Sequence, residues 1–184
     1  MWQAAAEARP CVFIDRDGTV VESVHYLRDP KDVSVPPEVI EGLHLLRQAG
    51  FMLILVSNQS GIARGYFSYA DLLAVHARMI ELFEAEGIVL DDYYYCPHAP
   101  DSGCACRKPE TGMLQTACRE HAIDLEHSVM VGDADCDMEL ASNFGLPGLL
   151  ILSERHTDPT LASHACQDFL EASQIILREY APQH

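Results

Sequence analysis

Two carboxylates one residue apart, Asp15 and Asp17, are the first side chains of this sequence that could do chemistry. They directly follow the apolar residues 12–14, which predict a short buried strand. Side chains alternate along a strand, so both carboxylates would project to the same side. Two like charges that close repel each other unless a cation or a proton lies between them. An acidic turn without a ligand is the alternative for this stretch alone.

Polar residues follow two other apolar runs in the same way. Ser57 comes directly after residues 51–56, with Arg64 further along the same loop, and Asp133 follows soon after residues 128–131. Each run predicts a strand buried on both faces, as in a parallel sheet. Ligand sites in such sheets lie at the carboxyl ends of the strands. We therefore expect these three side chains and the two carboxylates on one rim.

The predicted rim carries the groups that phosphoryl transfer needs. Asp15 and Asp133 are hard oxygen ligands suited to Mg²⁺, which takes one or two protein carboxylates and a substrate phosphate. A carboxylate can also attack phosphorus, and Asp15 is the candidate nucleophile. Asp17 is then placed to protonate the leaving alkoxide and later to deprotonate water. Lys108 and the Ser57 hydroxyl would hold the phosphoryl oxygens, where charge develops.

Asp137 allows two interpretations. It lies one turn after Asp133 in a predicted helix, from where its carboxylate could hold Lys108 in place. A solvated aspartate in the first turn of the helix, favoured by the helix dipole, explains it equally well.

A second group of ligands lies in a loop that contains Pro, Gly and Asp. Three thiols and one imidazole in an eleven-residue span match a tetrahedral zinc site, and they are Cys96, His98, Cys104 and Cys106. Because all four ligands are protein groups, the site would be closed and structural. We expect it to fix the loop that presents Arg107 and Lys108, which directly follow.

The segments around these residues predict alternating strands and helices. The predicted strands are residues 12–14, 51–56, 93–95, 128–131 and 149–152; the predicted helices lie between Pro37 and Gly50, between Ser68 and Gly87, and over residues 110–121, 138–144 and 169–180. Residues 22–35 predict a loop that hangs over the rim. This order predicts an α/β fold, a Rossmann-like three-layer sandwich with a mostly parallel sheet and a zinc-stapled loop.

The composition limits the class of ligand. The formal net charge is −16, which argues against nucleic acid and anionic membrane surfaces as partners. Only 12 residues are basic, and four of them fall in candidate loop motifs: Arg16, Arg64, Arg107 and Lys108. Scarce cations kept in loops indicate a small anionic ligand.

The length and the cysteines bear on organisation and location. We expect an N-terminal arm of residues 1–10 and a single domain over residues 11–184, present as a monomer. The seven cysteines fit metal binding in a reducing compartment better than a disulfide framework. Because the sequence contains no signal-peptide pattern and no stretch long enough for a membrane span, we expect a cytoplasmic location.

In these residues the sequence resembles the haloacid dehalogenase superfamily of phosphotransferases. Four motifs occur in the family's order, and they are residues 15–19, Ser57 with Asn58, Lys108 with Pro109, and Gly132 with Asp133 and Asp137. Any one of them is weak, but four in order on predicted loops are specific. The resemblance implies a Mg²⁺-dependent reaction through an aspartyl-phosphate intermediate. Because no long insertion follows the first or third strand, it also implies no large cap domain.

The zinc loop narrows the resemblance. Residues 58–65, 96–98 and 106–113 are similar to the branch that contains D-glycero-D-manno-heptose 1,7-bisphosphate phosphatases and histidinol-phosphate phosphatases, and most to the heptose enzymes. This implies removal of the phosphate at carbon 7, in bacteria a step toward activated heptose for lipopolysaccharide. A histidinol-phosphate phosphatase is one alternative. A non-catalytic zinc-stapled binding module is another, against which the intact set of catalytic motif residues argues.

The resemblance implies a role for each matching residue. Asp15 would be the nucleophile and Asp17 the acid/base, and Mg²⁺ would bind Asp15, the Asp17 backbone carbonyl and Asp133. Ser57 and Lys108 would hold the transferring phosphoryl group. The substrate-binding set would be Ser23, His25, Tyr26, Asn58, Gln59, Ser60, Arg64 and Arg107.

Overall fold

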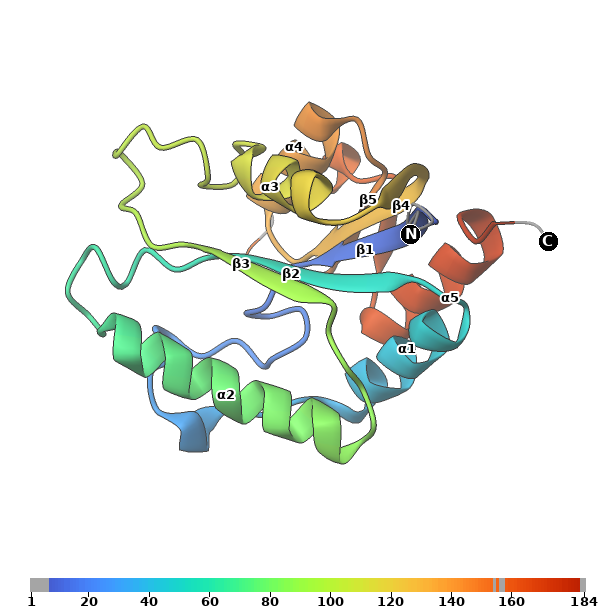
Figure 1. The fold of residues 1–184 in the computed structure, drawn as a ribbon. Coiled ribbons are helices and arrows are strands. Elements are labelled where there is room, and N and C mark those ends of the chain that lie inside the picture. Colours follow the sequence, from blue (N-terminus) through green and yellow to red (C-terminus); the bar gives the residue numbers. More distant parts are fainter. Residues whose placement is uncertain (1–6, 154, 156–157, 183–184) are drawn as a thin grey trace, which may run out of the picture.

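Six strands form one parallel sheet in the computed structural model of the chain, which describes residues 7–153, 155 and 158–182. The strands are β1 (Arg9–Ile14), β2 (Met52–Asn58), β3 (Asp92–Cys96), β4 (Ile123–Gly132), β5 (Gly148–Ile151) and β6 (His164–Cys166). Their order is β3-β2-β1-β4-β5-β6, and every neighbouring pair is parallel (Figure 1). The sheet therefore has β1 and β4 at its centre, with β2 beside β1.

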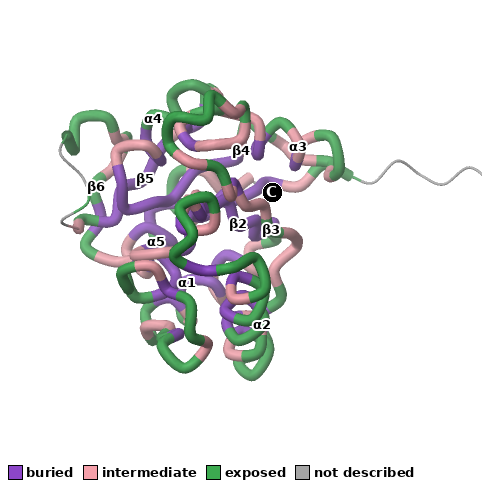
Figure 2. Tube along the Cα trace, turned by 90° about the vertical axis from the view of Figure 1, so that its left-hand side faces the viewer, coloured by how far each residue is buried: buried purple, intermediate pink, exposed green. Residues whose placement is uncertain are grey.

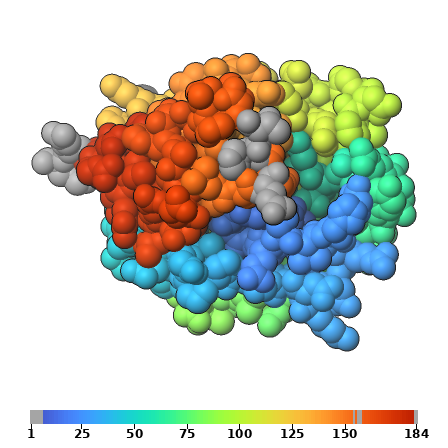
Figure 3. Space-filling view, turned by 180° about the vertical axis from the view of Figure 1, so that it is seen from behind, coloured from blue at the N-terminus to red at the C-terminus, as the bar shows by residue number. Residues whose placement is uncertain are grey.

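Helices cover both faces of the sheet. They are α1 (Pro37–Gln48), α2 (Tyr69–Ala85), α3 (Gly112–Glu120), α4 (Asp135–Phe144) and α5 (Phe169–Glu179). Helices α1, α2 and α5 pack on one face, and α3 and α4 on the other (Figure 1). On the first face α5 lies against α1, as the red and cyan segments in Figure 3 show. This is the predicted three-layer sandwich.

The central strand explains why the apolar runs lack alternation. Val12 and Ile14 belong to the core beneath α1, α2 and α5, whereas Cys11 and Phe13 belong to the core beneath α3 and α4. All four are fully buried, since both faces of a parallel sheet are covered by helices. Figure 2 shows the buried backbone concentrated along the strands in the middle of the molecule.

Local signals fix several helix ends. Ser68 precedes α2 and accepts a hydrogen bond from the Asp71 backbone N–H, while the Asp71 carboxylate accepts one from the Ser68 N–H. This reciprocal pair satisfies two donors that the helix leaves free. At the C-terminal end of α4, Gly145 takes a left-handed conformation with φ +80°, which favours glycine. The predicted helix starts and stops are therefore largely confirmed.

The structure extends the predictions at some points. Strand β6 was not predicted, because it is a three-residue edge strand with polar His164 in it. Strand β1 begins at Arg9, so the sheet includes two residues of the predicted arm, and residues 1–6 lie outside the described part of the chain. The segments after β1 and β3 form no cap domain among the described residues, only loops and the 3₁₀ turn Pro30–Asp32. None of the described helices has the length and apolar character needed to span a membrane.

Candidate active site and metal-binding loop

A buried lysine joins the carboxylates at the carboxyl ends of the central strands. Lys108 Nζ lies 2.5 Å from Asp15 Oδ1 and 2.6 Å from Asp137 Oδ1, and it donates to the Val56 carbonyl at 2.9 Å. The side chains of all three charged residues are at most 5% exposed. Asp137 is therefore the residue that holds Lys108, and the alternative of a solvated aspartate is wrong.

Burial and mutual charge set the protonation of this cluster. Burial opposes the charged form of Lys108, but the Asp137 and Asp15 carboxylates outweigh it and raise the lysine pKa above its ordinary value. Burial raises the pKa of Asp137, with Lys108 acting against it. Burial and the nearby Asp15 charge raise the pKa of Asp133 to about 7. Asp15, Asp133 and Asp137 are three carboxylates around one lysine, so Lys108 alone does not balance their charge.

The geometry of the carboxylates fits a cation. Asp15, Asp133 and Asp137 each offer an oxygen, and these oxygens lie within 4.8 Å of one another. Asp15 Oδ2 is buried and has no hydrogen-bond partner among the described residues. The backbone also comes close: Gly18 has φ +88°, and a Cβ at this position would lie 2.2 Å from Asp133 Oδ2. Glycine is thus required for the turn to approach Asp133.

Arg155 is a member of the site that sequence reasoning missed. Its Nη1 lies 3.0 Å from Asp133 Oδ1 and 3.2 Å from Asp133 Oδ2, and it also donates to the Asp17 backbone carbonyl. Arg155 is 138 residues from Asp17 in the chain and follows no recognisable motif. A positive charge at this point compensates the buried carboxylates. Its presence there supports the cation-binding character of these oxygens.

The second carboxylate, Asp17, is held apart from the lysine. Arg16 donates to both Asp17 oxygens at 2.9 Å, and Gln59 Nε2 donates to Asp17 Oδ2 at 2.8 Å. The same Gln59 nitrogen donates to Ser57 Oγ at 2.9 Å. Arg16 is 1% exposed and holds Asp17 through two of its nitrogens, while its Nη1 has no hydrogen-bond partner among the described residues. Asp15 and Asp17 therefore lie in different surroundings, as different chemical roles require.

Asn58 connects the second strand with the lysine segment. Its side-chain Nδ2 donates to the Lys108 carbonyl at 3.1 Å, and its Oδ1 accepts from the Lys108 N–H at 3.0 Å. Both ends of the amide are thus used to hold the backbone of Lys108. The sequence predicted Asn58 as a substrate-binding residue but did not predict its hydrogen bonds to Lys108.

A cavity of about 550 Å³ opens over Asp17. Its lining includes most of the predicted substrate-binding residues: Ser23, His25, Tyr26, Asn58, Gln59 and Ser60. Arg64 lies further out, exposed, and its Nη1 donates to the Tyr26 hydroxyl at 2.9 Å. The Tyr26 ring packs on Tyr66 with centroids 4.2 Å apart. Of the predicted covering loop 22–35, residues 23–27 therefore line this cavity, and the contacts of Tyr26 with the loop after β2 fix its position.

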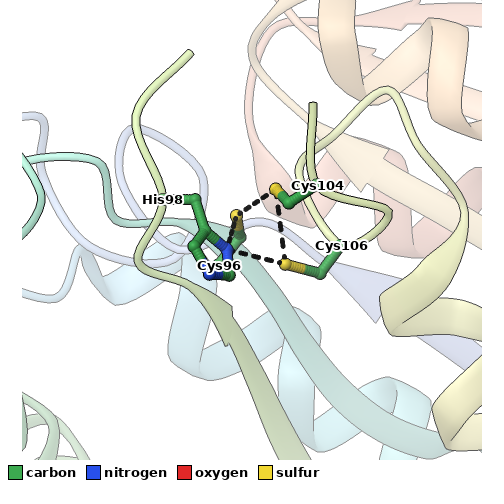
Figure 4. Close-up of side chains that lie close together, drawn as sticks. All are labelled: Cys96, His98, Cys104 and Cys106. Atoms are coloured by element: carbon green, nitrogen blue, oxygen red, sulfur yellow. Dashed lines mark hydrogen bonds between the residues drawn. The ribbon is translucent and has the colours of Figure 1, made fainter. Parts of the chain in front are cut away.

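The predicted zinc ligands converge in the loop after β3. Cys96, His98, Cys104 and Cys106 point toward one another (Figure 4). The Sγ atoms of Cys96 and Cys106 each lie 3.6 Å from Cys104 Sγ, and His98 Nδ1 lies 3.6 Å and 3.2 Å from the Sγ atoms of Cys96 and Cys106. Ligands on a tetrahedral zinc lie about 3.6–3.8 Å apart, given Zn–S and Zn–N bonds of about 2.3 Å and 2.1 Å. The cluster therefore has the dimensions of a zinc site.

Arg107 lies between the two sites. It lines a cavity of about 400 Å³ together with Ser102, Cys104 and Lys108, and its Nη1 is buried without a hydrogen-bond partner among the described residues. A buried guanidinium nitrogen without an acceptor favours an anion or a polar ligand group.

The sequence is similar to a protein family and to several curated proteins. Residues 105–173 match the family described as HAD-hydrolase-like. The chain is 42% identical over 95% of its length, and 99% of the relative, to D-glycero-D-manno-heptose-1,7-bisphosphate 7-phosphatase of Thermosynechococcus vestitus. It is 40% identical over 88% of its length to the histidine biosynthesis bifunctional protein HisB of Legionella pneumophila. The chain spans only 46% of that bifunctional protein.

A solved structure shares the fold. The crystal structure of D,D-heptose 1,7-bisphosphate phosphatase from B. bronchiseptica, complexed with magnesium and phosphate, superposes with a TM-score of 0.80 at 31% identity. The match covers 92% of this chain and 99% of the other.

Proposed function

Because the chain belongs to the haloacid dehalogenase-like (HAD-like) hydrolases, we propose that it is a Mg²⁺-dependent phosphatase that removes the phosphate at carbon 7 of D-glycero-D-manno-heptose 1,7-bisphosphate. One observation carries the proposal: Lys108 binds Asp15 Oδ1 at 2.5 Å, while the buried Asp15 Oδ2 has no hydrogen-bond partner in the described part of the chain. A carboxylate held on one oxygen and unoccupied on the other suits a nucleophile. The names of the relatives and of the similar crystal structure supply the substrate.

The reaction proceeds in two displacements. Asp15 Oδ2 attacks phosphorus, and the bond to the leaving sugar oxygen breaks while Asp17 gives that oxygen its proton. Asp17 then takes a proton from the water that attacks the aspartyl phosphate, which releases phosphate and restores Asp15. Lys108 and the Ser57 hydroxyl hold the phosphoryl oxygens and offset their charge.

The metal would be held by Asp15, the Asp17 backbone carbonyl and Asp133, and it would supply positive charge to the phosphoryl oxygens. The buried carboxylates Asp15 and Asp133 lie close together, and the Arg155 guanidinium contacts Asp133 and the Asp17 carbonyl. Both observations support a cation there. Zn²⁺ would be held by the four loop ligands as a structural ion.

Substrate recognition is assigned to two groups of residues. The cavity over Asp17 would bind the sugar through Ser23, His25, Tyr26, Gln59 and Ser60, with Asn58 acting through Lys108. Arg107 would bind the end of the sugar away from the reacting phosphate, and its Nη1, which has no partner within the described residues, supports this role. Arg64 would act through Tyr26, to whose hydroxyl it donates.

The first test is turnover by the Asp15→Asn variant. We expect Mg²⁺-dependent phosphate release from the wild-type protein, and a loss of at least about 10³-fold in kcat for the variant, since a carboxamide is a poor nucleophile. Asp124→Asn, in a partly exposed aspartate paired with His127, is the matched control and should retain full activity. Near-full activity of Asp15→Asn would contradict the covalent mechanism.

The second test separates the heptose substrate from histidinol phosphate, which the HisB relative makes the second candidate. We expect kcat/KM to be higher for the bisphosphate, and Arg107→Ala to lower it far more for the bisphosphate than for the monophosphate. Higher kcat/KM for histidinol phosphate would favour the second candidate. No phosphatase activity over a panel of sugar phosphates would favour a zinc-stapled binding module.

We also propose that the protein works as a monomer in the reducing cytoplasm. None of the seven cysteines is in a disulfide bond, which supports a reducing compartment.

A further inference from the structure

Arg155 donates from a single nitrogen to oxygens of two distant chain segments. Its Nη1 contacts the Asp17 backbone carbonyl after β1 and both oxygens of Asp133 after β4. The Asp133 side chain is 0% exposed, whereas that of Arg155 is 43% exposed. In the usual arginine–carboxylate pair, two guanidinium nitrogens each donate to one carboxylate oxygen. Here a single nitrogen is shared among three oxygens, which is the arrangement of ligands around a metal ion.

The oxygens that Arg155 contacts belong to the set assigned to Mg²⁺ above. The lone pairs that the Asp17 carbonyl and the Asp133 carboxylate direct at Nη1 can bind a metal ion only if the metal takes the place of Nη1. Two positive charges within bonding distance of the same oxygens also repel each other strongly. Occupation by Arg155 and by the metal is therefore mutually exclusive.

We propose that Arg155 competes with Mg²⁺ for this position: it neutralises the buried carboxylates of the metal-free protein and withdraws when the metal binds. The inference rests on the proposed Mg²⁺ dependence. Arg155 is thereby a positioning residue that sets metal affinity, without a direct part in the reaction.

The surroundings of Arg155 permit this exchange, and those of the other cation do not. Arg155 borders the cavity of about 550 Å³ over Asp17 and a second one of about 640 Å³ beside Gly18 and Asp133. Its half-exposed side chain can thus move without losing its hydration. Lys108, in contrast, is 2% exposed and holds three partners, so it stays in place.

The experiment is calorimetric titration of Mg²⁺ into the zinc-loaded protein without substrate. We expect Arg155→Met to bind Mg²⁺ about tenfold more tightly than the wild type, the equivalent of one charge-assisted hydrogen bond that no longer has to be broken. Arg155→Gln, which keeps hydrogen-bond donors without the charge, should also bind more tightly. Arg78→Met is the matched control, because Arg78 is 44% exposed and pairs with Glu81 on the surface of α2; we expect a change of less than about twofold.

A melting experiment provides a second readout. In Mg²⁺-free buffer Arg155→Met should melt below the wild type, since its carboxylates lose their counter-charge, and saturating Mg²⁺ should remove the difference. If the wild type binds Mg²⁺ and both variants bind it equally or more weakly, the inference is wrong while the proposed function stands. If neither the wild type nor the variants bind Mg²⁺, the proposed metal dependence is wrong, and the inference with it.

Discussion

The two clusters of ligand side chains in this protein are positioned in different ways. The carboxylate–lysine cluster lies at the ends of β1 and β4, and Lys108, Asp15 and Asp137 are buried and bound to one another. The thiol–imidazole cluster lies in the loop after β3, where His98, Cys104 and Cys106 are partly exposed and contact mainly one another. The ends of the sheet fix the first cluster, whereas three of the four ligands of the second lie in a loop and only Cys96 belongs to a strand.

The comparison predicts the largest stability effect at the zinc loop. Cys106→Ser should lose the proposed zinc and destabilise the protein by roughly 5 kcal/mol. This is less than the ~10–16 kcal/mol of zinc-finger peptides, because the core of the domain forms without the loop. Metal analysis and thermal melting measure both. Cys118→Ser, in α3 and outside the cluster, is the control. A variant with full zinc content and unchanged melting would refute a ligand role for Cys106.

Removal of the lysine should lower the stability of the protein at the carboxylate–lysine cluster. Lys108→Met leaves the buried carboxylates Asp15 and Asp137 without a counter-charge, which costs about 3–5 kcal/mol of the free energy of unfolding. Urea denaturation measures it, with Lys31→Met at an exposed position as the control. Equal stability of the two variants would mean that the cluster does not depend on its internal ion pairs. Activity of Lys108→Met should be lost in any case.

The same cluster should make stability depend on pH when Mg²⁺ is absent. The pKa of Asp133 in the folded protein, about 7, lies above the ordinary value of 3.8. A raised carboxyl pKa means that the folded state binds the proton more tightly, so stability is highest below about pH 4 for this group and falls as the pH rises toward 7. We expect a loss on the order of 4 kcal/mol over this range.

Asp133→Asn is the variant that isolates this effect. Its unfolding free energy, measured by urea denaturation in Mg²⁺-free buffer, should vary less with pH than that of the wild type. Identical pH profiles would assign the dependence to other groups. Saturating Mg²⁺ should also flatten the wild-type profile, because the metal offsets the charge of the carboxylate.

The smallest expected effect concerns the contact between Asn58 and the backbone of Lys108. Asn58→Ala removes two hydrogen bonds to the Lys108 backbone and should cost about 1–2 kcal/mol in the free energy of unfolding. Because both lost hydrogen bonds hold the backbone of Lys108 and neither reaches a zinc ligand, Asn58→Ala should lower kcat and leave the zinc content unchanged. Asn143→Ala, which loses one exposed contact to the Pro109 carbonyl, is the control. Loss of zinc from Asn58→Ala would mean that the two clusters are not independent.

The fold was largely predictable because its signals are local. Continuous apolar runs identify strands buried on both faces. Ser68 marks a helix start because its hydroxyl accepts from the Asp71 N–H, and Gly145 marks a helix end through its left-handed backbone. Strand β6 was missed because it is three residues long and its pairing with β5 depends on the folded sheet.

The sequence alone determined which residues can do chemistry. Asp15 and Asp17 are adjacent to one strand end, and the four zinc ligands lie within one loop, so their proximity follows from short chain connections. Only the tertiary structure decided that Asp137 holds Lys108 rather than facing solvent, and that Arg155 reaches Asp17 across 138 residues. Such contacts arise when distant segments meet at the edge of the sheet, and no local spacing encodes them.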